Sequence, residues 1–483
     1  MYKNLRGHPG VLLAAVAVAQ FAVALDMSVV NVALPAVRSA LGFGPLGLSW
    51  VVHAYALALG GFLLLGGRAA DLYGRRRLFV LGLAVFGLCS LAGGLALTPW
   101  QLIAARAGQG LGAAAATPAS LAMLTTTFAE GPPRVRALGV WSGVNAAGGA
   151  LGVLAGGLLT EYAGWRWVML VNLPIVAVAL ALALAGARPD VRPARRERLD
   201  VLGAALATGG VGLLVLGVVR SDARGWGSPV TWAVLAASAA LLAAFVLVES
   251  RAAAPLLRLG LLRSRWVAGA NVLVFFAAAG QFAAFYFVSL YMQQVLGMGA
   301  AATGAAFLPF SVSLIAGTLV ATRITAARTP RTSLVPGALL AAAGLAWFAC
   351  IRPDGGFLGD VLGPCIVTGI GVGLVIAPIV AAATTGVAGH EAGAASGLMN
   401  SSRQLGGCIG LAVLATVAAH RTGAATGPAA LNDGYALGLA IAAALFVVAA
   451  VVAIGVLPRS LRAAAPDPRP AASAPTRLEG TRS

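Results

Sequence analysis

The chain has 483 residues, of which 59% are hydrophobic and only 10% are charged, and its formal net charge is +18. Soluble domains contain roughly 25% charged residues, so this composition excludes an ordinary soluble protein. The single lysine, Lys3, cannot complete a GxxxxGK loop, which excludes a P-loop nucleotide site of the chain's own.

The apolar residues are gathered in long runs. A helix needs about 20 mostly apolar residues to cross a bilayer, and runs of this kind recur from Val11 to Leu457. We therefore predict an all-α integral membrane protein with fourteen transmembrane helices, at residues 11–34, 48–67, 78–97, 100–125, 137–160, 167–187, 199–219, 229–248, 266–291, 300–322, 333–351, 358–384, 393–419 and 435–457.

The basic residues are distributed unevenly between the two sides of the predicted bundle. With the N-terminus inside the cell, 25 of the 33 arginine and lysine residues fall on the cytoplasmic side. This bias orients both termini toward the cytoplasm. Because topology accounts for the net charge, we expect no nucleic-acid partner.

The first predicted span contains a carboxylate, Asp26, within the segment LDMSVVNVALP (Leu25–Pro35). An ionisable group at the centre of a bilayer costs at least about 2.5 kcal/mol, so its default explanation is a function. Asn31 is a further polar residue of this segment, and we consider it a candidate contact for a substrate.

His53, in the second predicted span, allows two interpretations. It falls near the outer end of the span, where it could be a hydrogen-bonded histidine at the membrane interface. It could instead exchange protons with Asp26, because histidine titrates near neutral pH. The sequence leaves both interpretations open.

The loop after the second span has the pattern G-x-x-x-D-x-x-G-R-R-R. Its glycines permit a tight turn and a close approach of helices, and its acid could pair with an arginine or cap a helix. Three arginines alone would indicate only a cytoplasmic loop, whereas the complete pattern is too specific for that explanation alone. The residues concerned are Gly67, Asp71, Gly74, Arg75, Arg76 and Arg77.

The fourth predicted span contains a second buried charge, Arg106, at a depth comparable with that of Asp26. A buried arginine must pair or reach water, and Asp26 is the only anion in the middle of a span. Gln109 lies three residues further on and shares the Arg106 face; it is another candidate for substrate contact. The alternative is an arginine held by backbone carbonyls in a purely structural role.

The fifth predicted span contains glycines at every fourth position, Gly148, Gly152 and Gly156, with Gly157 beside the last. A stripe of small residues lets another helix pack closely. The stripe could take part in conformational coupling, or it could serve packing alone.

Two arginine-rich stretches, at residues 188–200 and 251–265, separate the spans into a 6 + 2 + 6 arrangement. We predict an N-terminal six-helix bundle at residues 1–187 and cytoplasmic linkers with an inserted helix pair at residues 188–265. A C-terminal six-helix bundle follows at residues 266–457. Residues 458–483 are rich in proline, alanine and arginine and indicate a disordered cytoplasmic tail.

Polar and aromatic residues inside the remaining spans are candidates for lining a substrate cavity. Each of them could instead form a hydrogen bond between helices. No further acid lies in the middle of a late span, which disfavours a strongly dicationic substrate. The candidates are Asn145, Gln281, Phe285, Tyr286, Gln293, Asn400 and Gln404.

Together these patterns resemble those of a known family. The loop from Gly67 to Arg77 is similar to the signature loop between spans two and three of the major facilitator superfamily. Four further segments resemble motifs of its fourteen-span drug:proton antiporter branch: Leu25–Pro35, Arg106–Gly112, Gly148–Gly157 and Gly164–Pro174.

The chain departs from the branch's pattern at two positions. Ser28 stands where threonine is usual, and Val153 stands where a proline commonly follows the second glycine of the fifth-span motif. The second departure bears on the direction of transport, because the complete fifth-span motif is the one that implies export.

The resemblance implies the major facilitator fold and a proton-coupled secondary transporter. Such a protein exports a drug, antibiotic or secondary metabolite by alternating access, with Asp26, Arg106 and His53 as the proton-coupling residues. The loop after span two and the glycines of span five would be its conformational motifs. A proton-coupled importer of a small metabolite is the alternative, and an intramembrane enzyme is a remote one.

We expect the chain to be neither an enzyme nor a cofactor- or metal-binding protein. It has no catalytic nucleophile motif, and its four cysteines are isolated, without CxxC spacing. The expected partners are a small-molecule substrate, protons and the lipid bilayer, with no nucleotide. We expect a monomer in the plasma membrane of a bacterium.

Overall fold

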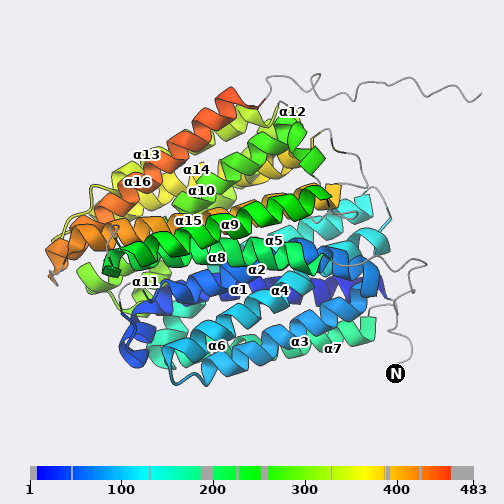
Figure 1. The fold of residues 1–483 in the computed structure, drawn as a ribbon, viewed down its shortest axis with the longest axis horizontal. Coiled ribbons are helices and arrows are strands. Elements are labelled where there is room, and N and C mark those ends of the chain that lie inside the picture. Colours follow the sequence, from blue (N-terminus) through cyan, green and yellow to red (C-terminus); the bar gives the residue numbers. More distant parts are fainter. Residues whose placement is uncertain are drawn as a thin grey trace, which may run out of the picture.

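The computed structural model of the chain describes residues 8–44, 47–129, 132–186, 200–224, 228–251, 259–327, 329–385, 387, 392–423 and 427–457. Within these ranges every regular element is helical (Figure 1). The α-helices are α1 (Pro9–Leu41), α2 (Trp50–Tyr73), α3 (Arg75–Gly94), α4 (Pro99–Thr127), α5 (Pro132–Tyr162), α6 (Arg166–Leu170), α7 (Asn172–Gly186), α8 (Val201–Arg224), α9 (Pro229–Arg251), α10 (Arg265–Leu290), α11 (Ala300–Ala306), α12 (Leu308–Ala327), α13 (Arg331–Phe348), α14 (Gly363–Thr384), α15 (Ala392–Thr422) and α16 (Pro428–Gly455).

Thirteen helical segments of the described residues are long and apolar enough to cross a membrane. The other long helix, α4, has 29 residues and contains the buried Arg106 and Gln109; it packs against α2 and α3. Each predicted span overlaps one of these helices, which confirms the all-helical membrane fold.

Two of the predicted spans are interrupted. The span at 167–187 consists of α6 and α7, and the span at 300–322 consists of α11 and α12. Pro174 and Pro309 lie in the first turn of the second helix of each pair. Proline has no backbone N–H and fits the first turn of a helix, which suits the start of α7 and of α12. Prolines also lie inside α1, α4, α13 and α14 without ending those helices.

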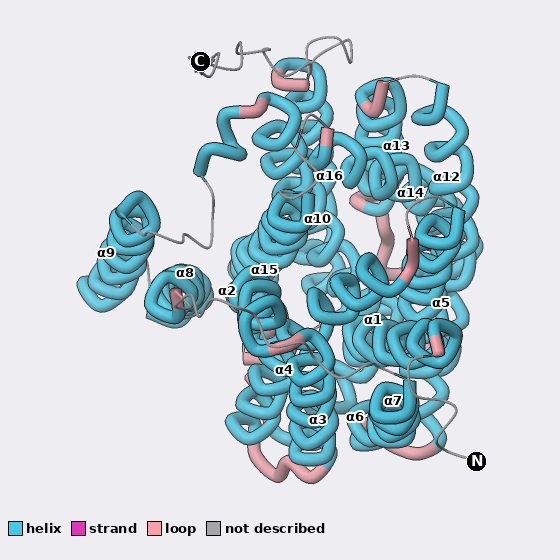
Figure 2. The backbone as a smooth tube through the Cα atoms, turned by 90° about the vertical axis from the view of Figure 1, so that its right-hand side faces the viewer, coloured by secondary structure: helices cyan, strands magenta, loops and turns pink. Residues whose placement is uncertain are grey.

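The helices form two groups that meet along the middle of the molecule (Figure 2). In the first, α1 packs on α5 and α7, and α4 packs on α2 and α3. In the second, α14 packs on α12 and α13, and α10 packs on α15 and α16. The helices α8 and α9 lie to one side: α8 contacts α2 and α15, while α9 packs on α8.

The contacts between helices do not test the predicted domain boundaries. The predicted tail, residues 458–483, lies entirely outside the described residues. So do most of the linker residues that precede, join and follow α8 and α9 within 188–265. The 6 + 2 + 6 arrangement and the cytoplasmic position of the termini stay predictions.

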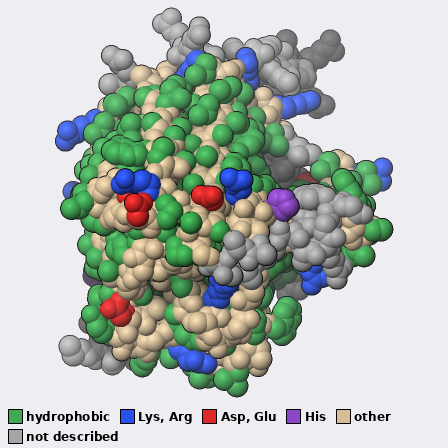
Figure 3. All heavy atoms as spheres, turned by 90° about the vertical axis from the view of Figure 1, so that its left-hand side faces the viewer, with side chains coloured by type: hydrophobic (Ala, Val, Ile, Leu, Met, Phe, Trp, Pro, Cys, Tyr) green, Lys and Arg blue, Asp and Glu red, His purple; other side chains and the backbone are tan. Residues whose placement is uncertain are grey.

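The two helix groups also contact each other toward the end of the bundle where α1 ends, here called the Leu41 end. A Cβ atom at Gly304 of α11 would lie 2.8 Å from the Val153 carbonyl oxygen of α5, and Gly157 faces the Ala300 carbonyl. Figure 3 shows this end face, on which charged side chains are few and scattered among hydrophobic and neutral ones.

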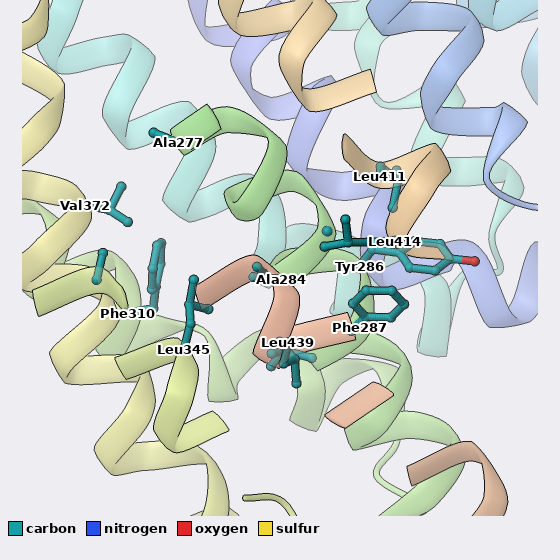
Figure 4. Close-up of a cluster of buried hydrophobic side chains, with 14 of the residues drawn as sticks. Ala277, Ala284, Tyr286, Phe287, Phe310, Leu345, Val372, Leu411, Leu414 and Leu439 are labelled. Carbon is teal, nitrogen blue, oxygen red and sulfur yellow. The ribbon is translucent and has the colours of Figure 1, made fainter. Parts of the chain in front are cut away.

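A large apolar core fills the second group of helices. Figure 4 shows part of it, with Phe287 and Leu439 close together between α10 and α16 and with Phe310 and Val372 approaching from α12 and α14. One face of α10 and of α15 packs in this core, and the opposite face of each helix is directed toward the middle of the molecule.

Candidate functional site

Asp26 lies near the middle of α1 and is completely buried. Its Oδ2 atom is 2.6 Å from Nη1 of Arg106. Its Oδ1 atom accepts hydrogen bonds from Nε2 of Gln109, at 3.0 Å, and from Nδ2 of Asn172, at 2.8 Å. All these donors suit an ionised carboxylate, which only accepts hydrogen bonds.

The N-terminus of α4, the helix that carries Arg106, is fixed by a capping box. Thr98 caps the helix by accepting a hydrogen bond from the backbone N–H of Gln101, and the Gln101 side-chain oxygen accepts one from the backbone N–H of Thr98. Pro99 occupies the first helical position. This capping box satisfies N–H groups that have no partner within the helix. Arg106 therefore enters the bundle two turns below that end.

The Arg106 guanidinium is enclosed on several sides. Its Nε atom donates to the Val51 carbonyl of α2 at 3.0 Å, and Nη1 also donates to Oε1 of Gln109 at 2.8 Å. Its central carbon lies 4.4 Å from the centre of the Tyr55 ring, within the range of a cation–π interaction. The backbone contact that the sequence left as an alternative is thus present beside the ion pair.

Gln109 links this pair to a third helix. Its Nε2 atom also donates to Oγ of Ser90 at 2.7 Å, and that hydroxyl donates to the Phe86 carbonyl of α3. The cluster of Asp26, Arg106, Gln109 and Asn172 thus joins α1, α4 and α7, with Ser90 of α3 behind it. We call these four residues the charge cluster.

Asn172, Tyr55 and Ser90 belong to or adjoin this site without having been predicted from the sequence. Asn172 interrupts an otherwise apolar stretch, which was the available signal, and it lies in the segment Gly164–Pro174 that resembles a family motif. Nothing in the sequence relates Tyr55 or Ser90 to Asp26, since their proximity arises only when α2 and α3 pack on α4.

The charge cluster is close to electrically neutral as long as Asp26 is ionised. A proton on the carboxylate would remove the charge that faces Arg106 and leave a buried cation with only neutral acceptors. Breaking a buried ion pair is strongly destabilising for the arrangement that contains it. Protonation of this single group can therefore shift the balance between two packings of the helices around it.

A small cavity lies beside the charge cluster, between the two helix groups. Its walls come from α1, α2, α4 and α10, and Arg106 is the member of the charge cluster that reaches it. The lining residues are Met27, Val30, Asn31, Val52, Tyr55, Ala56, Arg106 and Phe282. The cavity therefore places Arg106 at the boundary between the two helix groups.

His53 is completely buried between α2 and α15. Its Nδ1 atom lies 3.3 Å from Sγ of Cys408, and its ring stands edge-on to Trp50. The ring therefore faces protein on all sides, and its interpretation as a hydrogen-bonded histidine at the membrane interface stays a prediction. Among the described residues its ring nitrogens form no hydrogen bond with Asp26, so the proton-relay role stays a prediction without a direct contact.

The glycine stripe of α5 packs on α1 directly beside Asp26. A Cβ atom at Gly152 would lie 2.8 Å from the Leu25 carbonyl oxygen, and one at Gly156 would lie 2.5 Å from that of Val29. Gly148 contacts α1 one turn further along, at Ala24. The stripe thus sets how closely α5 approaches the segment of α1 that carries the carboxylate.

We expect Gly156→Ala to destabilise the protein by about 1–3 kcal/mol, because the added methyl group overpacks a contact made by backbone that cannot move alone. Gly149→Ala is the matched control, since a Cβ atom at Gly149 would meet only Oγ of Ser28, at 3.7 Å. Thermal unfolding in nanodiscs measures both variants. Equal unfolding midpoints for the two would contradict this account of the stripe.

The loop motif after the second span lies at the junction of α2 and α3. Gly74 joins the helices with φ of 104°, a conformation that other residues rarely adopt. Arg75, Arg76 and Arg77 form the first turn of α3, and Nη2 of Arg76 donates to the Leu184 carbonyl of α7. Gly67 faces Pro118 of α4; the side chain of Asp71 lies outside the described residues.

The other predicted substrate residues are dispersed. Asn31 lines the cavity. Three of the remaining side chains form hydrogen bonds within the protein: Asn145 accepts one from Gln20, Gln293 donates one to the Val32 carbonyl, and Asn400 donates one to the Ser396 carbonyl. Phe285 stacks on Phe307, and Tyr286 is buried in the core. Gln281 is half-buried in α10, and Gln404 is buried in α15. Their roles in substrate binding stay predictions.

Comparison with known proteins gives consistent results along the whole chain. The Major Facilitator Superfamily model matches residues 16–411. A cephamycin export protein of Amycolatopsis lactamdurans is 46% identical over 93% of this chain and 92% of its own. A puromycin resistance protein of Streptomyces alboniger is 42% identical over 91% of this chain and 90% of its own.

Two solved structures share the fold at low sequence identity. A bacterial homologue of the human lysosomal transporter Spinster, in an inward-facing occupied conformation, has a TM-score of 0.65 and 17% identity, covering 94% of this chain and 98% of its own. The inward-open xylose transporter of E. coli has a TM-score of 0.61 and 13% identity, covering 94% and 97%.

Proposed function

The chain belongs to the Major Facilitator Superfamily, and from this premise we propose that it exports an antibiotic, another drug or a secondary metabolite in exchange for protons. It is a multi-pass protein of a bacterial plasma membrane. The members of this family are transporters and not enzymes, and we extend that statement to this chain. We further propose that the monomer is the working unit.

The observation that carries the proposal is the buried ion pair of Asp26 and Arg106 at the edge of a cavity between the helix groups. Asp26 is the only carboxylate in the middle of a span of the chain. A single proton-binding group whose partner lines the cavity is what an exchange of protons for a solute requires.

The cycle follows from the two charge states of Asp26. A proton that enters from outside neutralises Asp26, releases Arg106 from its partner and favours the state open to the cytoplasm. Loss of that proton to the cytoplasm restores the ion pair as the substrate binds. The protein then returns to the outward-open state and releases the substrate.

The membrane potential limits what this cycle can achieve. One proton that moves inward through about 100 mV supplies about 2.3 kcal/mol. Since about 1.4 kcal/mol corresponds to a tenfold concentration ratio, one-for-one exchange with a neutral substrate sustains a gradient of about fiftyfold.

We expect cells that produce the protein to tolerate higher concentrations of at least one of a panel of structurally diverse antibiotics and dyes. Their accumulation of that compound should be lower than in control cells, and an uncoupler should abolish the difference because it removes the proton gradient. Uptake that rises on production of the protein would instead favour an importer. Efflux that persists with the uncoupler would contradict proton coupling.

A further inference from the structure

A second arginine in the membrane region, Arg403, has no role in the cycle described so far. It is the twelfth of the 31 residues of α15, about 16 Å along the helix axis from Ala392. Among the described residues it forms neither an ion pair nor a hydrogen bond, and its side chain is half-buried. A charge at this depth is costly unless it is paired or meets a polar occupant.

Arg403 shares its face of α15 with Gly407, one turn further along. Gly407 leaves room for the ring of Phe282 from α10, and Phe282 lines the cavity together with Tyr55 and Arg106. The Tyr55 ring in turn lies against the Arg106 guanidinium, whose central carbon is 4.4 Å from the ring centre. Arg403 therefore belongs to the same central region as the charge cluster.

Two buried polar side chains near Arg403 lack partners of their own. Among the described residues the Tyr55 hydroxyl has no hydrogen-bond partner, although the side chain is only 2% exposed. Within the same part of the chain neither atom of the Gln404 amide has a partner, and that residue is 1% exposed where it packs against Gly60 of α2. Buried polar atoms are nearly always hydrogen-bonded, so these groups indicate a polar occupant between α2 and α15, which lie side by side (Figure 2).

The charges of this region have an excess of one sign. Asp26 and Arg106 offset each other, whereas Arg403 has no carboxylate partner among the described residues. A guanidinium binds a carboxylate or phosphate more strongly than a neutral group, through charge-assisted hydrogen bonds. The Tyr55 hydroxyl and the Gln404 amide could donate to the same anion.

We propose that Arg403, Tyr55 and Gln404 form a binding site for the anionic group of the substrate, and that the transported compound is an organic anion with an apolar body. This inference rests on the proposed export function and names the class of its substrate. The anionic group pairs with Arg403, and Phe282 contacts the apolar part.

Arg403 also makes an anionic substrate compatible with exchange for a proton. An anion alone near Asp26 would attract the proton to that carboxylate and oppose its release. An anion paired with Arg403 forms a nearly neutral unit, whose field at Asp26 is much weaker. Arg106 can then keep Asp26 as its partner while the substrate is bound.

Binding of two dyes to the purified protein in nanodiscs tests the proposal. Fluorescein, an anion, and pyronin Y, a cation, share the xanthene ring system, and fluorescence anisotropy reports the affinity of each. We expect the wild type to bind fluorescein more tightly. Arg403→Gln should weaken fluorescein binding by at least about tenfold, as expected for a charge-assisted contact, and leave pyronin Y binding unchanged or stronger.

Three further variants separate this site from a structural role of Arg403. Arg403→Lys keeps the charge and should retain most of the fluorescein affinity, and Tyr55→Phe should weaken it by a few-fold through the loss of one hydrogen bond. Arg421→Gln, which removes an exposed arginine at the end of the same helix, should change neither affinity. The unfolding temperature of each variant reports whether it folds.

The outcomes that overturn the proposal are specific. They are a wild type that does not bind fluorescein more tightly than pyronin Y, or an Arg403→Gln variant that weakens both dyes equally. Because no proton gradient is present, either outcome leaves proton-driven export standing. Loss of uncoupler-sensitive efflux in cells, in contrast, would contradict export without bearing on the preference for anions.

Discussion

Asp26→Asn is expected to abolish active efflux while leaving substrate binding intact. The amide has almost the same shape as the carboxylate but cannot take up and release a proton. For a neutral test compound, the concentration ratio across the membrane should therefore fall from as much as about fiftyfold, the limit for one proton at about 100 mV, to one. Efflux from preloaded cells and binding to the purified protein measure the two properties separately.

Asp360→Asn is the matched control for this substitution. Asp360 also forms an ion pair with an arginine, Arg352, but it does so at the Leu41 end, where the arginine side chain is 64% exposed. We expect efflux by this variant to continue at close to the wild-type rate. Equal losses of efflux in the two variants would mean that any broken ion pair disables the protein. The assignment of Asp26 as the proton-coupling residue would then be contradicted.

Arg106→Leu is expected to destabilise the protein by about 3–5 kcal/mol, because it leaves the Asp26 carboxylate buried without its cation. Gln109 and Asn172 still donate hydrogen bonds to it, but they provide no charge. The double variant Asp26→Asn/Arg106→Leu should recover much of this loss, because removal of both charges from a buried pair is often close to neutral. It should nevertheless remain inactive in efflux.

Unfolding midpoints of the single and double variants in nanodiscs test this expectation. Arg352→Leu is the comparison, and it should shift the midpoint less, because Arg352 is 64% exposed although its partner Asp360 is only 7% exposed. If Arg106→Leu were as stable as Arg352→Leu, the ion pair would not be the stabilising element of the charge cluster.

Hydropathy predicts the fold of this chain well because a bilayer leaves few choices. Backbone polar groups within the membrane must be satisfied internally, so runs such as 78–97 and 435–457 could only be helices. The breaks before α7 and α12 were harder to anticipate. They depend on where Pro174 and Pro309 fall relative to the neighbouring helices, and hydropathy does not contain that information.

The charge cluster could be anticipated only in part. Asp26 and Arg106 were found because each is costly in a membrane, and the absence of another mid-membrane acid made them natural partners. Asn172 and Tyr55 cost much less to bury, so the sequence gives them little emphasis. Their contact with the ion pair follows from the packing of α2 and α7 on their neighbours.

His53 illustrates why position along a span is a weak guide to burial. Its place near the end of the predicted helix favoured the membrane interface, but α15 covers that part of α2 and buries the ring against Cys408. The same packing surrounds Gln404. Contacts between helices so distant in sequence cannot be inferred from one chain's hydropathy.

The movement of protons in proteoliposomes tests most directly whether Asp26 is the proton-carrying group. Purified protein is reconstituted with a pH-sensitive dye inside the vesicles, and a gradient of an exported compound is applied without an initial pH gradient. The wild type should move protons in the direction opposite to the compound. Asp26→Asn should move none, although it still exchanges labelled for unlabelled compound, and proton movement by this variant at the wild-type rate would contradict the assignment.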